Sequence, residues 1–128
     1  MARRILPADL GVTVLLVDSI TEINGDDAGC LVISGSHGGR SAARYAAAVV
    51  LAGCVFNDAG TGKDDAGIAG LAALAYPALA CSHRSARIGD PQDAWDNGIV
   101  SAVNAAAQAA GLRSGMTVQA AFRQLAGG

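Results

Sequence analysis

The two histidines of this chain and its single lysine stand in polar turns that follow short apolar runs. His37 and His83 each come soon after such a run, and Lys63 lies in a longer loop after another. Imidazole accepts and donates protons near neutral pH, and an ammonium group is a compact cation that can also lose its proton. These three side chains are therefore the first candidates for acid–base chemistry.

Asp58 is the carboxylate best placed to assist them, because it stands beside Asn57 at the end of an apolar run. We expect His37 or His83 to act as general acid or base, Asp58 to orient it and Lys63 to hold negative charge. The structural alternative is that Asp58 bonds backbone N–H groups of its own loop and that Lys63 pairs with an adjacent aspartate.

Glycine-rich turns near these positions suit an anionic ligand. Glycine N–H groups are unobstructed and can surround an oxyanion, and arginine can hold a carboxylate or phosphate with two hydrogen bonds. The alternative is that the glycines only permit tight turns and that Arg87 pairs with Asp90 or Asp93. The expected substrate- or anion-binding residues are Ser36, Gly38, Gly39, Gly60, Gly62, Ser82 and Arg87.

The segment 60–63 reads Gly-Thr-Gly-Lys and is similar to part of a phosphate-binding loop. That loop needs a glycine where this chain has Asn57, and a serine or threonine where it has Asp64. The segment therefore argues against an ATPase.

The segment 30–60 resembles an arrangement found in caspase-like cysteine peptidases. These enzymes place His-Gly after one hydrophobic strand and Asp-Ala-Cys after the next, as His37-Gly38 and Asp58-Ala59 stand here. Gly60 occupies the position of the nucleophilic cysteine. The resemblance therefore lacks the atom that carries the peptidase reaction, and we do not assign the chain to that family.

The leading interpretation is a small enzyme that hydrolyses or eliminates at a carbonyl-type centre of a small polar or anionic metabolite. No resident cofactor is implied. One alternative is a divalent-metal site formed by Asp18, Asp58, His37 and His83, although their spacing matches no known ligand pattern. Another is a non-catalytic anion-binding or assembly module, in which the alanine-rich segment 102–110 packs against a second subunit as a homo-oligomer.

Four short apolar runs that break into polar turns predict the strands that position these residues. Their alternation with helical patterns predicts one α/β domain over residues 1–128. It should have three layers, with a mainly parallel four-stranded sheet between alanine-rich helices. The predicted strands are 12–17, 30–33, 54–56 and 78–81, and the predicted helices are 41–52, one from Asp64 or Asp65 to Pro77, one from Asp90 to Gly111, and one from Thr117. The segment 18–29 fits either a crossover with one helical turn or a wide hairpin.

Composition argues against a nucleic-acid-binding, a membrane-spanning and a secreted protein. The 128 residues include 28 alanines, are 52% hydrophobic and carry a net charge of −2 without a basic stripe, so nucleic acid is not an expected partner. The apolar run 12–17 is too short to span a bilayer and no cleavage site follows it. Cys30, Cys54 and Cys81 lack metal-binding spacing and indicate reduced thiols in the cytoplasm.

Overall fold

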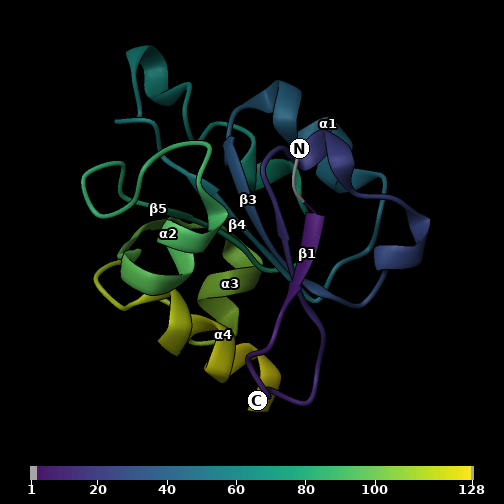
Figure 1. The fold of residues 1–128 in the computed structure, drawn as a ribbon. Helices are drawn as coiled ribbons and strands as arrows, with labels where there is room; N and C mark the ends of the chain where they lie inside the picture. The colour runs from purple at the N-terminus through teal and green to yellow at the C-terminus, as the bar shows by residue number, and fades with distance from the viewer. Residues whose placement is uncertain (1–2, 128) are drawn as a thin grey trace.

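Six strands form one sheet in the computed structural model, which describes residues 3–127 (Figure 1). In the order in which they lie side by side, they are β1 (Arg3–Leu6), β2 (Val14–Val17), β3 (Leu31–His37), β4 (Gly53–Asn57), β5 (Ala78–Cys81) and β6 (Val100–Val103). The strands β2 to β5 are parallel, and β1 and β6 are antiparallel at the edges. The prediction of a mainly parallel α/β sheet is confirmed, but the sheet has six strands where four were predicted.

Helices cover both faces of this sheet and give the three layers (Figure 1). One face packs against α1 (Arg40–Ala47) and the 3₁₀ turns η1 (Ile20–Glu22) and η4 (Leu71–Ala73); the other packs against α2 (Pro91–Asn97), α3 (Ala105–Ala109) and α4 (Val118–Gly127). Every residue of β2, β4 and β5 is buried, as expected for strands covered on both sides.

The path of the chain explains which helices lie on which face. The parallel strands β2 to β5 advance across the sheet in one direction, and right-handed connections between such strands all fall on the same face. The three connections accordingly carry η1, α1 and η4, which share one hydrophobic core. The opposite face is left for the segment after β5, which contributes α2, α3 and α4.

The predicted helix from Asp90 to Gly111 is wrong. Asp90 does begin a helix, since its side chain accepts a hydrogen bond from the Asp93 N–H, but α2 ends at Asn97 and the chain continues into β6 and α3. Gly98 follows at the C-terminal cap in an extended conformation. The β-branched residues after it then favour a strand over the helical spacing that suggested one long helix.

The predicted helix from Asp64 or Asp65 to Pro77 is also wrong, because this segment contains only the 3₁₀ turns η3 (Lys63–Asp65) and η4. Its backbone instead packs directly on the start of α1. The Gly70 N–H donates to the Gly38 carbonyl at 2.9 Å, and the Gly38 N–H donates to the Gly67 carbonyl at 2.7 Å. A regular helix would use these groups internally.

The other helical predictions differ mainly at their ends. The helix predicted over 41–52 is α1, which ends at Ala47 before two valines, and Gly53 begins β4 instead of capping the helix. The segment 18–29 is a crossover with two 3₁₀ turns. The terminal helix expected from Thr117 is confirmed as α4. None of the helices among residues 3–127 combines the length and the apolar character needed to cross a bilayer.

Candidate active site

The chain segments that leave β4 and β5 run to opposite faces of the sheet. The segment after β4 leads to η4 beside α1, whereas the segment after β5 leads to α2 on the other face. In α/β sheets, ligands bind outside the carboxyl ends of strands at such a divergence. Asp58 is the first residue after β4 and His83 is the second residue after β5. The topology therefore brings these two predicted site residues together.

The Asp58 carboxylate is buried and accepts four hydrogen bonds. Its Oδ1 accepts from the Gly60 N–H at 2.8 Å and from the His83 N–H at 3.0 Å, and Oδ2 accepts from the Ser101 hydroxyl at 2.7 Å. Burial by itself raises the pKa of Asp58, but the hydrogen bonds from Ser101, Gly60 and His83 outweigh it and leave the pKa below the ordinary aspartate value. Asp58 is therefore an ionised, rigidly held carboxylate at neutral pH.

The His83 ring is oriented by this carboxylate. Its Nδ1 lies 3.3 Å from Oδ1 of Asp58, and the side chain is 47% exposed. An ionised carboxylate only accepts hydrogen bonds, so Nδ1 carries the proton in the neutral ring. Nε2 then presents its lone pair, which is the arrangement of an oriented general base.

Ser101 is the residue of the candidate site that sequence reasoning missed. It lies in β6, 43 residues after Asp58, and its hydroxyl also lies 3.4 Å from the Ala80 carbonyl. Because one helix was expected from Asp90 to Gly111, Ser101 was not placed at the end of the sheet with Asp58. The signal that would have revealed it is the Asn97-Gly98 pair, which ends α2 and begins a turn into a β-branched segment.

His37 occupies the other side of the segment 59–62. Its Nδ1 accepts a hydrogen bond from the Gly39 N–H at 3.0 Å, so the neutral ring carries its proton on Nε2. His37 lines a cavity of about 220 Å³ together with residues of the segment 59–67. On the opposite side, a Cβ placed on Gly60 would lie 3.5 Å from the His83 ring. The two imidazoles thus border the same short segment but present opposite tautomers.

The backbone of this segment is unusual. Ala59 and Thr61 have φ values of 53° and 62°, and Asp64 and Asp65 have values of 54° and 57°. Such left-handed conformations cost non-glycine residues about 1–2 kcal/mol each, and strain of this kind concentrates at functional sites. The segment is held by a 2.7 Å hydrogen bond from the Gly67 N–H to the Thr61 carbonyl. These constraints keep Gly60 against His83.

The four amides predicted to stabilise an oxyanion are all engaged within the protein. The Gly38 N–H donates to the Gly67 carbonyl, and the Gly62 N–H donates to the Gly60 carbonyl. The remaining two amides, those of Gly39 and Gly60, hold the side chains of His37 and Asp58 as described above. In this conformation the glycines position the two catalytic candidates instead of facing an open anion site.

Two predicted hydroxyl groups organise neighbouring loops. The Ser36 Oγ accepts from the Ile20 N–H at 3.0 Å, and the Ser82 Oγ accepts from the Arg84 N–H at 3.1 Å. Each hydroxyl keeps its own proton available as a donor.

The predicted cations Arg87 and Lys63 have no carboxylate within ion-pair distance among residues 3–127. The Arg87 backbone N–H, and not its side chain, contacts Asp93. The alternative that Arg87 forms an ion pair with Asp90 or Asp93 is therefore not seen. Both side chains remain open to an external anion.

The proposed metal ligands are not assembled. Across residues 3–127, no three His, Cys, Asp or Glu side chains form a group suited to a metal ion. Asp58 and His83 contact each other, but Asp18 and His37 do not join them as a ligand set.

Cys81 lies beside this site but is not arranged as a nucleophile. It is 1% exposed, and burial raises the pKa of its thiol to about 12, with a smaller contribution from the Asp58 charge. A thiol reacts as its thiolate, so a pKa this high disfavours reaction at neutral pH. The interpretation of Cys81 as a small core residue fits this environment.

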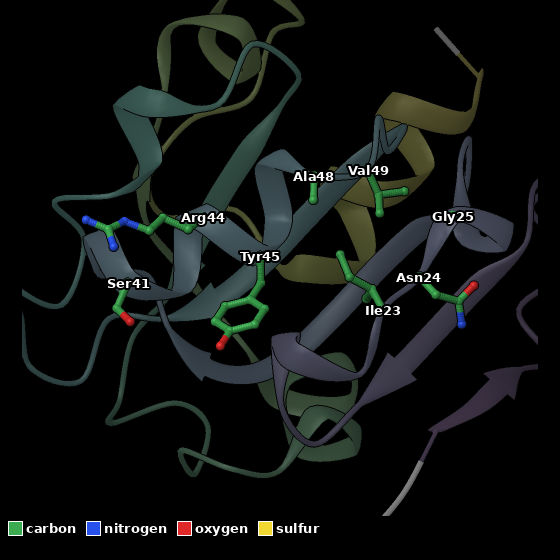
Figure 2. A pocket seen from close by; sticks show the side chains of 8 residues that line it. All are labelled: Ile23, Asn24, Gly25, Ser41, Arg44, Tyr45, Ala48 and Val49. Atoms are coloured by element: carbon green, nitrogen blue, oxygen red, sulfur yellow. The ribbon is translucent and has the colours of Figure 1, made fainter.

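A larger hollow, of about 440 Å³, lies away from the predicted site between α1 and the turn that follows η1 (Figure 2). Tyr45 and Arg44 extend from α1 at this hollow, and Ile23 and Asn24 border it from the turn (Figure 2). It contains none of the predicted catalytic residues. The largest side-chain hollows therefore need not coincide with the predicted acid–base residues.

Comparison with protein-family models, curated proteins and solved structures finds no significant match to this chain. We therefore derive the function from the geometry of the residues.

Proposed function

We propose that this protein is a small cytosolic enzyme that uses general acid–base catalysis at a carbonyl-type centre of a small polar or anionic molecule. The supporting observation is the Asp58–His83 pair, in which a buried carboxylate fixes the imidazole so that Nε2 is free. The reaction is a hydrolysis or an elimination. In both cases His83 accepts a proton and Asp58 stabilises the resulting imidazolium.

In a hydrolysis, Nε2 of His83 takes a proton from water as the water oxygen attacks the carbonyl carbon. The imidazolium then returns that proton to the leaving group as its bond to carbon breaks. In an elimination, Nε2 instead takes the proton from the carbon next to the carbonyl, and the electron pair expels the leaving group. Both routes need one base that can also act as an acid, which a half-exposed histidine satisfies.

A non-catalytic anion-binding module is the second candidate, and the unpaired cations favour it. Lys63 and Arg87 have no carboxylate within 4.0 Å among the described residues. Such cations would hold an anion equally well in a sensor and in an enzyme. Only turnover separates these two functions.

The test is incubation of the purified protein with a mixture of small anionic metabolites, followed by mass spectrometry. Wild-type protein should consume at least one anionic metabolite, whereas His83→Gln should slow this consumption by about 100-fold or more. Asp58→Asn should slow it as well, because the amide no longer fixes the same tautomer. Circular dichroism would establish that both variants are folded.

Two results would contradict the enzyme. A metabolite that co-purifies or is retained but is never converted would favour the binding module. Equal consumption by wild type and by folded His83→Gln would remove His83 from the mechanism.

A further inference from the structure

Two cavities adjoin on the α1 side of the segment 59–62, away from His83. His37 lines one of about 220 Å³, and Arg40 and Lys63 line another of about 370 Å³. Ala66 belongs to the walls of both. Ala66 is therefore the wall that the two cavities share. Around it lie Arg40 at the start of α1, Lys63 in η3 and His37 at the end of β3.

The side chains at these cavities are predominantly hydrogen-bond donors. The neutral His37 ring has its proton on Nε2, because the Gly39 N–H occupies Nδ1. Arg40 and Lys63 are cations, and neither has a carboxylate within 4.0 Å in the described part of the chain. Asp64 also lines the larger cavity, and no cation lies within that distance of it. Donor groups that line two cavities sharing Ala66 match a ligand group that only accepts hydrogen bonds.

Close backbone packing shapes this region before any ligand binds. A Cβ placed on Gly39 would lie 2.7 Å from Nδ1 of His37 and 2.9 Å from the Ala66 carbonyl oxygen. Glycine is thus required for the His37 ring to lie against the start of α1. The Gly38–Gly67 hydrogen bond then holds Gly67, which lines the smaller cavity, against the chain before α1. Such preformed contacts lower the ordering cost of binding.

We propose that His37, Arg40 and Lys63 form a subsite for a carboxylate or phosphate group of a small ligand. Arg40 and Lys63 supply the charge, and His37 donates from Nε2. The inference rests on the proposed function only where it takes this ligand to be the substrate of His83.

The strand registers indicate how far this subsite lies from the reacting group. His37 is in register with Asn57, and Asn57 with Cys81. The backbones of His37 and Cys81, which stands two residues before His83, are therefore separated by two strand spacings, about 10 Å. The substrate would then carry its anionic group on one side of the segment 59–62 and its reacting carbonyl on the other. The proposal therefore favours an elongated anionic molecule as the substrate.

Binding of inorganic phosphate and of acetate tests the subsite without any assay of turnover. Each anion is titrated into ¹⁵N-labelled protein, and the imidazole nitrogens of His37 and the backbone amides around Ala66 are followed by NMR. Shifts that saturate with phosphate alone would identify a phosphate site, and shifts with acetate would identify a carboxylate site. Arg40→Gln and Lys63→Gln should each weaken the affinity about tenfold, the effect of losing one charge-assisted hydrogen bond.

Arg113→Gln and Arg123→Gln are matched controls, because they remove the same charge elsewhere and should leave the affinity unchanged. His83→Gln separates the two proposals, since it should slow turnover by about 100-fold or more but keep anion binding. The subsite is overturned if neither anion produces saturable shifts at His37, or if the control arginine variants weaken binding as much as Arg40→Gln does. Retention of binding with no turnover in wild type would instead contradict the enzyme and leave the subsite supported.

Discussion

The Ser101 hydroxyl donates a 2.7 Å hydrogen bond to Oδ2 of Asp58, and this contact joins the antiparallel edge strand β6 to the end of the central strand β4. The other carboxylate oxygen holds His83. Asp58 is thereby fixed from two strands, and the orientation of the imidazole depends on both. Edge strand β6 therefore contributes to the candidate site as well as to the sheet.

Ser101→Ala should remove one hydrogen bond to the Asp58 carboxylate and leave those from Gly60 and His83 in place. We expect a loss of about 1 kcal/mol in the free energy of unfolding, the usual net value of one hydrogen bond. The pKa of Asp58 should rise toward its ordinary value, because the Ser101 hydroxyl is the strongest of the hydrogen bonds that lower it. Chemical denaturation and a ¹³C NMR titration of the Asp58 carboxyl would measure the two effects. Ser101→Thr keeps the hydroxyl and serves as the control; equal titrations in all three proteins would refute this role.

Asp58→Asn should change how stability depends on pH. The folded pKa of Asp58 is lowered, so the ionised group stabilises the fold above the unfolded pKa, near 4, and this contribution is lost as the pH falls through the folded pKa. We expect the variant to be less stable than wild type by about 1–3 kcal/mol at pH 7, with the difference shrinking below pH 4. Urea denaturation at pH 7, 5 and 3 would measure it. A difference that stays constant over this range would contradict the assignment.

The buried thiols should resist alkylation in the folded protein. Burial raises the pKa of Cys81 to about 12, so its thiolate fraction at pH 8 is on the order of 1,000-fold smaller than that of a free cysteine. Cys54 is completely buried and should behave similarly, while Cys30 is partly exposed. Iodoacetamide labelling followed by peptide mass spectrometry should modify Cys30 first. Rapid labelling of Cys81 in folded protein would show that its thiol is accessible and would make it a candidate nucleophile again.

Gly70→Ala should destabilise the fold by about 1–3 kcal/mol through overpacking. A Cβ at Gly70 would meet the backbone of Gly39 and lie 2.7 Å from the Cβ of Ala43, so η4 could not approach α1 as it does. Gly25→Ala is the matched control, because nothing lies within 4 Å of the added Cβ there. Thermal unfolding of both variants would compare them. Equal melting temperatures would mean that the close approach of η4 to α1 is not required.

The sequence predicted the central strands and the edge at which the polar groups gather, because buried parallel strands are short apolar runs that end abruptly. The run 78–81 coincides with β5, and Asp58 and His83 fall at the ends of neighbouring strands as expected. Their direct contact depends on β4 and β5 being adjacent and in register. That adjacency is set by the whole topology and leaves no local mark in the sequence.

Three features escaped prediction for identifiable reasons. Apolar residues recur at helical spacing from Trp95 to Ala110 and alanine favours helices, so the pattern predicted one helix where β6 (Val100–Val103) interrupts it. The predicted helix from Asp64 or Asp65 to Pro77 runs through Gly67 and Gly70, which instead pack closely against the backbone of neighbouring segments. The amides of Gly38 and Gly60 looked free, but whether a loop N–H is satisfied depends on tertiary contacts that only the folded chain supplies.

The most direct test of the central claim is the tautomeric state of the neutral His83 ring, read from the ¹⁵N chemical shifts of its ring nitrogens. The proposed mechanism predicts a proton on Nδ1 and a free Nε2 in wild type, with His37 showing the opposite tautomer as an internal reference. In Asp58→Asn the preference of His83 should be lost while that of His37 persists. A proton on Nε2 of His83 in wild type, or a tautomer unaffected by Asp58→Asn, would contradict the assignment of His83 as a base oriented by Asp58.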